Sequence, residues 1–201
     1  MTKERDKINS ARIVGCIGIL NVISDRAIES RCNRTRSIFP SVSTDSMSAI
    51  VSGAIPETLS PQVQTVLNFL TLLGAGDIDK LSNLLSDDLS YYVHPKSLNI
   101  PCLAKHEWLQ RVKKGFVGMK FYIFEIVCER PSVAVHASST ATSRTGGSYA
   151  NEYSFWFHLE QQPEGTHRMK TVKEFLDSKY IIEFKTEETE RAEKLANYNM
   201  S

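Results

Sequence analysis

The spacing of apolar residues changes from a helical to a strand period near residue 117, and this change constrains the fold more than any other feature. Before it, apolar residues recur every three or four positions in three segments, which predicts helices. After it, apolar and polar residues alternate through four long segments, which predicts β-strands. A sheet of this kind has to cover its apolar face, and the preceding helices are available to do so. The sequence therefore predicts an α+β fold.

The helical part of the chain is predicted to contain three helices, with one strand between the second and the third. Ser60-Pro61 is a typical helix start, because serine caps free backbone N–H groups and proline fits the first helical position. Trp108 lies on the apolar side of the third helix. The predicted elements are helices over residues 61–73, 78–85 and 105–116 and a strand over residues 87–93.

Four long strands and a final helix are predicted to follow. Arg130-Pro131 and Thr145-Gly146-Gly147 separate successive strands, because proline and glycine favour turns. The strands are expected over residues 120–129, 133–144, 149–160 and 168–177, and the helix over residues 178–197. The expected order is α-α-β-α-β-β-β-β with a C-terminal helix.

The chain divides near residue 56. Residues 1–55 are rich in arginine and serine and hold one short apolar stretch, 13–23, which is too short to span a bilayer. We expect a poorly ordered leader here, with one strand or helix near 11–23, and we expect residues 1–46 to be dispensable for the activity. The folded domain is predicted over residues 56–186, and a charged C-terminal helix or tail over 187–201.

Composition argues against several classes of function. The 24 basic and 23 acidic side chains give a formal charge of +1, so no nucleic-acid partner is expected. No apolar run approaches the roughly 20 residues that span a membrane, so no membrane partner is expected either. The cysteines are widely spaced, and the histidines and acids are not at metal-ligand spacing. P-loop, dinucleotide and nucleophile-elbow motifs are absent, and we expect neither a metal nor a cofactor.

The same cysteine pattern favours reduced thiols in a cytoplasmic protein. A mitochondrial transit peptide within residues 1–46 is the alternative, because arginine and serine are enriched there. Glu4, Asp6 and Asp25 count against this alternative, since such peptides are poor in acidic residues.

One face of the strand 149–160 is predicted to line a pocket. Asn151, Tyr153, Phe155 and Phe157 share this face, because side chains alternate along a strand. Apolar walls with a few polar groups are typical of a small-molecule pocket. The alternative is that Asn151 and Tyr153 only satisfy backbone groups at the strand end.

The acid and base candidates are one glutamate and two histidines. Glu174 lies between apolar neighbours on the last strand, so burial would raise its pKa toward the range useful to a general acid or base. The alternative for Glu174 is an ion pair with a basic neighbour. His94 ends the strand 87–93 directly after Tyr92 and Val93, and His136 lies within the strand 133–144. The alternative for each histidine is a structural or exposed position.

Three strings carry a resemblance to a known family, namely GAGDIDKLSNLLSDDLSYYVHP, YANEYSFWF and VKEFLDS. Residues 57–184 resemble a SnoaL-like domain of the superfamily named after nuclear transport factor two, which includes ketosteroid isomerase and scytalone dehydratase. The resemblance implies a cone-like curved antiparallel sheet with the three N-terminal helices on its concave face, around a deep apolar pocket. It also implies a homodimer through the outer sheet face, where Trp156 and His158 would lie.

Two function hypotheses follow. The first is a cofactor-independent isomerase, dehydratase or cyclase that moves protons on a small hydrophobic polyketide- or terpenoid-like molecule. Glu174 with His94 or His136 would be catalytic. The substrate-binding candidates are Tyr92, Trp108, Asn151, Tyr153, Phe155 and Phe157. The second hypothesis is a non-catalytic ligand-binding or dimerisation module of the same fold. The two differ in whether Glu174 and a histidine face one cavity.

Overall fold

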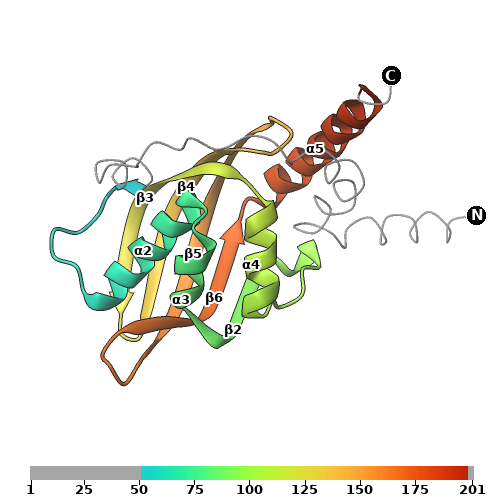
Figure 1. Ribbon diagram of the computed structural model, residues 1–201. Coiled ribbons are helices and arrows are strands. Elements are labelled where there is room, and N and C mark those ends of the chain that lie inside the picture. Colours follow the sequence, from blue (N-terminus) through green and yellow to red (C-terminus); the bar gives the residue numbers. More distant parts are fainter. Residues whose placement is uncertain (1–50, 199–201) are drawn as a thin grey trace, which may run out of the picture.

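A curved sheet of six strands forms the frame of the molecule, and the computed structural model describes residues 51–198 (Figure 1). The expected leader structure near residues 11–23 and the expected dispensability of residues 1–46 concern positions outside the described residues. The elements are, in order, β1 (Val51–Gly53), α2 (Pro61–Ala75), α3 (Ile78–Asn83), β2 (Leu85–His94), a 3-10 helix (Lys96–Leu98), α4 (Lys105–Lys114), β3 (Val117–Glu129), β4 (Ser132–Thr142), β5 (Ser148–Gln161), β6 (His167–Leu176) and α5 (Ser178–Tyr198).

The sheet is mixed, with the strand order β1-β3-β4-β5-β6-β2. Strands β3 to β6 form an antiparallel meander, whereas β1 pairs in parallel with β3 and β2 pairs in parallel with β6. The expectation of a wholly antiparallel sheet is therefore wrong at both edges. Alternation along a strand predicts which side chains are buried. It does not predict which strand will pair with β1 or β2, because helices separate both of them from the meander in the sequence.

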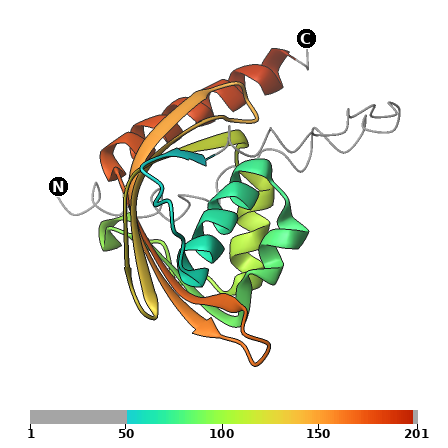
Figure 2. The same cartoon turned by 90° about the vertical axis from the view of Figure 1, so that its left-hand side faces the viewer.

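Helices α2, α3 and α4 lie together on the concave side of the sheet (Figure 2). Ser60 caps α2 through the backbone N–H of Val63, at 3.3 Å, and Gly76 ends this helix in the left-handed conformation. Asp77 caps α3 by accepting from the backbone N–H of Lys80 at 3.1 Å. These short local signals set the helix boundaries that the sequence predicts.

Aromatic side chains join the helical layer to the sheet. Phe69 of α2 stacks on Trp108 of α4 with ring centroids 5.4 Å apart, and it meets Phe157 of β5 edge-on at 5.6 Å. All three side chains are buried. Stacked and edge-on arrangements are the favourable ones for aromatic rings, so this cluster fixes both helices against the concave face.

The C-terminal helix α5 extends from one end of the sheet (Figure 1). Asp177 caps it, accepting from the backbone N–H groups of Lys179 and Tyr180 at 3.0 and 3.1 Å. The helix is continuous across the boundary expected at residues 186–187. Its buried Glu188 accepts a hydrogen bond from Thr145, which anchors the helix to the turn between β4 and β5, and a second one from Arg191 of the same helix. No helix within residues 51–198 has both the length and the apolar character that a membrane crossing requires.

Candidate functional site

A cavity of about 140 Å³ lies between the concave face of the sheet and the helices. Strands β2, β3, β5 and β6 line it together with α4 and with one end each of α2 and α5. Most of the lining side chains are apolar. The ionisable ones are Tyr91, Arg111, Tyr149, Tyr153 and Glu174. A small set of polar groups in apolar walls is the usual composition of a small-molecule site.

Glu174 is the acidic residue of this cavity. It lies on β6 between Val172 and Leu176, on the concave face, as strand alternation predicts. Burial among apolar groups raises the pKa of its carboxyl to about 7, against the opposing effect of a hydrogen bond from Tyr91. The part of its surface that stays accessible faces the cavity. A carboxyl with this pKa can accept or donate a proton near neutral pH.

Tyr91 holds the carboxyl of Glu174 in place. Its hydroxyl donates to Oε2 of Glu174 at 2.8 Å, and its ring stacks on Trp108 with centroids 4.9 Å apart. Among residues 51–198, no hydrogen bond is made to Oε1 of Glu174. One carboxyl oxygen is therefore positioned by the protein, and the other is available to a ligand.

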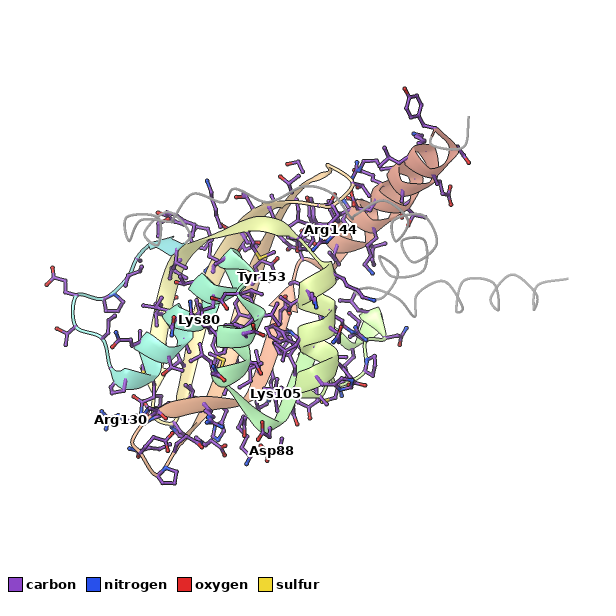
Figure 3. The ribbon with its side chains drawn as sticks, in the orientation of Figure 1. Lys80, Asp88, Lys105, Arg130, Arg144 and Tyr153 are labelled. Carbon is purple, nitrogen blue, oxygen red and sulfur yellow. The ribbon has the colours of Figure 1, made fainter. Side chains whose placement is uncertain are left out.

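Two tyrosines of β5 form the second polar group of the cavity. The hydroxyls of Tyr149 and Tyr153 lie 2.6 Å apart, and Ser139 donates to the Tyr153 hydroxyl at 3.1 Å. Burial raises the pKa of both tyrosines, so both stay protonated. The contact between them uses one hydroxyl proton, which leaves the other for a ligand oxygen. Figure 3 shows Tyr153 in the central part of the molecule, whereas Asp88 and Arg130 lie at the periphery.

The two candidate histidines lie outside the cavity. His94 stacks on Phe175 of β6 with centroids 4.4 Å apart, and neither residue lines the cavity. His136 is exposed and pairs with Glu152 at 2.6 Å. The structure therefore does not bring either histidine to Glu174. Apolar Val133, Val135 and Ala137 take the concave positions of β4, so His136 points to the outer face.

Tyr92 also lies outside the cavity. Strand β2 buries Tyr91 and Val93 and turns Tyr92 and His94 to the outer face. The neighbouring Tyr91, which sequence reasoning did not select, takes the inward position. The spacing of Leu89, Tyr91 and Val93 is the signal that could have identified it.

The remaining substrate-binding candidates divide into two groups. Trp108, Tyr153 and Phe155 line the cavity. Phe157 is buried in the core against Phe69, outside the cavity lining. Asn151 is buried beyond the lining as well, where its Oδ1 accepts from the backbone N–H groups of Glu152 and Asp177 at 2.7 and 3.1 Å. These bonds match the alternative in which Asn151 satisfies backbone groups.

Sequence reasoning also did not select Tyr149 and Arg111. Tyr149 precedes Asn151 in the same alternating pattern, so that pattern contains its signal. Arg111 lies three residues after Trp108 on α4 and therefore shares its side of the helix, which is the only sequence signal for it.

Within residues 51–198, no three His, Cys, Asp or Glu side chains are grouped so as to hold a metal ion.

Comparison by sequence with family models and with curated proteins finds no match. Comparison of structures finds the fold. AusH from Aspergillus nidulans matches with a TM-score of 0.52 and 24% identity, over 61% of this chain and 88% of AusH. BvnE pinacolase from Penicillium brevicompactum matches with a TM-score of 0.55 and 20% identity, over 68% and 96% of the two chains.

A third match, from Shewanella denitrificans, bears the name of a SnoaL-like polyketide cyclase. Its TM-score is 0.50 and its identity 15%, over 62% of this chain and 96% of the other. The protein thus shares the α+β fold of these three structures. Because one of the three bears a SnoaL-like name, the resemblance found in the sequence is confirmed at the level of the fold.

Proposed function

We propose that the protein is a cofactor-independent isomerase, dehydratase or cyclase that moves a proton on a small hydrophobic molecule. The observation that carries this proposal is Glu174, a carboxyl with a pKa of about 7 at the wall of an apolar cavity. A general base works best when its pKa lies near the working pH. Polyketide- or terpenoid-like skeletons suit the apolar walls, and the pinacolase and polyketide cyclase names of two structural neighbours agree with this class.

The proposed proton transfer needs no histidine. Oε1 of the Glu174 carboxylate takes a proton from a carbon next to a substrate carbonyl, and Tyr91 keeps Oε2 hydrogen-bonded. The electron pair of the broken C–H bond moves onto the carbonyl oxygen. The free hydroxyl proton of the Tyr149 and Tyr153 pair donates a hydrogen bond to this oxygen. Such a donor is most effective in a site without water. Glu174 then returns the proton to carbon.

The experiment that tests this function is solvent deuterium exchange with 2-tetralone, a small bicyclic ketone. The protein is incubated with the ketone in D2O near neutral pH, and the incorporation of deuterium is followed by mass spectrometry. We expect exchange above the uncatalysed rate, and we expect Glu174→Gln to lower it about 100-fold or more. Glu152→Gln is the matched control, because Glu152 lies on the outer face beside His136.

The second candidate function is a non-catalytic ligand-binding module. It is favoured by one observation, the absence of either candidate histidine from a mostly apolar cavity. Exchange that stays at the uncatalysed rate, or exchange that is equal in the wild type and Glu174→Gln, would support this module and contradict the enzyme.

We also propose that two copies of the chain associate through the outer face of the sheet. Four aromatic side chains from β3, β5 and β6 are exposed there: Tyr122 by 51%, Phe124 by 44%, Trp156 by 54% and Phe175 by 42%. We call this set the outer-face patch. A patch of this kind is typical of a protein interface. In a dimer with a two-fold axis, the outer-face patch of one copy would pack against the same patch of the other copy.

A further inference from the structure

We propose that Arg111 binds an anionic group of the substrate, so that the substrate class is a small hydrophobic carboxylate or an anion of similar geometry. This inference names the substrate class of the proposed function and rests on it. The structural basis is an arginine that lines an apolar cavity and makes no ion pair or hydrogen bond within residues 51–198.

Glu107 is the acidic side chain that acts on Arg111 in the described part of the chain, but the two form no ion pair. Arg111 lines the cavity beside Val112 and Phe116, and no ion pair or hydrogen bond joins its guanidinium to residues 51–198. Partial burial lowers its pKa, and the Coulombic attraction of Glu107, one turn earlier on α4, opposes this. The carboxylate of Glu107 already accepts from the backbone N–H of Ala104 at 2.9 Å.

Burying part of a charged side chain without a partner costs free energy. A ligand anion at this position would offset the cost. The planar guanidinium is well suited to the purpose, because it donates two parallel hydrogen bonds to one carboxylate. The apolar neighbours reduce the screening by water and strengthen such a contact.

Three further basic side chains lie near Arg111 and this end of the cavity. Lys113 and Lys114 lie in the last turn of α4 together with Arg111. Arg144 donates to the carbonyl oxygen of Lys113 at 2.9 Å, and Figure 3 shows it next to this end of α4. Gly115 also lines the cavity here and occupies little space. Basic side chains therefore outnumber acidic ones around Arg111, where Glu107 is the acidic one, and Gly115 leaves room for a ligand group.

Glu174 and Arg111 act at separate positions in the cavity. The pKa of Glu174 is set by burial and by Tyr91, and that of Arg111 by burial and by Glu107. Neither residue contributes to the pKa of the other, so the two charges are not paired. A substrate that spans the cavity would thus place its anionic group at Arg111 and its reacting carbon at Glu174.

The test compares two probes of nearly equal shape, 2-naphthylacetate and the uncharged 2-naphthylacetamide, by isothermal titration calorimetry. We expect the wild type to bind the acetate at least about tenfold more tightly than the acetamide. Arg111→Gln should abolish this preference and leave the acetamide affinity within about twofold of the wild-type value. Arg111→Lys should keep part of the preference, because it keeps the charge but loses the planar donor pair.

Lys114→Gln is the matched control, because it removes one positive charge from the same helix turn at an exposed position outside the cavity lining. The control should keep the preference for the acetate. Equal binding of the two probes by the wild type, no binding of either, or an equal loss of both in Arg111→Gln would overturn the inference.

The two proposals fail in different ways. A preference for the acetate that depends on Arg111, without any deuterium exchange, would contradict the proposed proton transfer and keep the anion site. Exchange that depends on Glu174, without a preference for the acetate, would contradict the anion site alone.

Discussion

The hydroxyl of Tyr91 donates a hydrogen bond of 2.8 Å to Oε2 of Glu174, and the two residues come from adjacent parallel strands, β2 and β6. This bond favours the charged carboxylate and so opposes the effect of burial on its pKa. Burial and this bond together therefore set the pH at which Glu174 acts as a base.

We predict that Tyr91→Phe raises the pKa of Glu174 above its present value of about 7. Hydrogen bonds to charged groups are worth about 1.5–3 kcal/mol, which corresponds to an increase of about one pKa unit or more. The measurement is an NMR titration of the side-chain carboxyl in protein labelled at glutamate. Tyr92→Phe, on the outer face of the same strand, should leave the titration unchanged. An unchanged pKa in Tyr91→Phe would contradict the assigned bond.

Glu174 also makes the stability of the protein depend on pH. Its pKa is near 4.5 in the unfolded chain and about 7 in the folded protein, so the folded state binds more protons between these values. The stability that this group contributes is present below pH 4.5 and is lost as the pH rises through about 7. One pKa unit corresponds to about 1.4 kcal/mol, and the whole loss is about 3 kcal/mol.

We therefore predict that Glu174→Gln flattens this pH dependence. Between pH 4 and pH 8.5 the wild type should lose about 3 kcal/mol more of its free energy of unfolding than the variant does. Urea unfolding at these two pH values measures it, and taking the difference between the two proteins removes the contribution of the other titrating groups. A constant difference would contradict the raised pKa.

Asn151 is predicted to act on stability. Its Oδ1 accepts from the backbone N–H groups of Glu152 and Asp177, which ties β5 to the start of α5. Asn151→Ala leaves both groups without this partner and should lower the free energy of unfolding by about 2 kcal/mol. Asn151→Asp keeps an acceptor oxygen and should lose less. An Asn151→Ala variant with wild-type stability but without deuterium exchange would instead show that Asn151 holds the substrate.

Much of the fold and part of the site could be predicted because the signals are local. Caps such as Ser60 and Asp77 depend on a few neighbouring residues, and the alternation through β6 places Glu174 on the concave face. In β2, two adjacent tyrosines point to opposite faces, so an assignment that is wrong by one residue exchanges Tyr91 for Tyr92.

The remaining features depend on contacts between distant parts of the chain. The parallel pairing of β2 with β6 brings Tyr91 to Glu174, which lies 83 residues later. Nothing in either segment indicates this partner. Arg111 reaches the cavity only because α4 packs across the sheet, so its place in the site follows from the assembled layers and could not be read from its own surroundings in the sequence.

Lys185 carries a buried ammonium whose Nζ has no hydrogen-bond partner in the described residues, and burial lowers its pKa to about 7. The unfolded chain keeps this proton up to about pH 10.5. Burial of the charged lysine therefore lowers the free energy of unfolding by its full amount below pH 7, and this loss of stability disappears as the pH rises to 10.5.

We predict that Lys185→Met raises the free energy of unfolding by about 1–3 kcal/mol at pH 6, and by much less at pH 10. Urea unfolding at both pH values measures this. Lys179→Met, at an exposed position of the same helix, is the matched control and should change little. A loss of stability in Lys185→Met at pH 6 would show that the lysine has a stabilising partner.

The outer-face patch leads to a prediction about assembly. Trp156 lies on the convex side of β5, opposite Ala134 of β4 and Lys173 of β6 in the register of the sheet, and it is 54% exposed. Trp156→Glu would place a charge in the middle of the proposed two-fold contact. Central aromatic residues at interfaces are worth about 2 kcal/mol or more, so the dimer should weaken at least about 30-fold.

Sedimentation equilibrium over a range of protein concentrations measures this effect. The wild type should sediment as a dimer, and Trp156→Glu as a monomer with an unchanged circular dichroism spectrum, because a half-exposed side chain contributes little to the core. Leu195→Glu is the matched control, since it places the same charge at an exposed apolar residue of α5, away from the sheet. A wild-type protein that is monomeric at every concentration, or a dimer that persists in Trp156→Glu, would contradict association through this face.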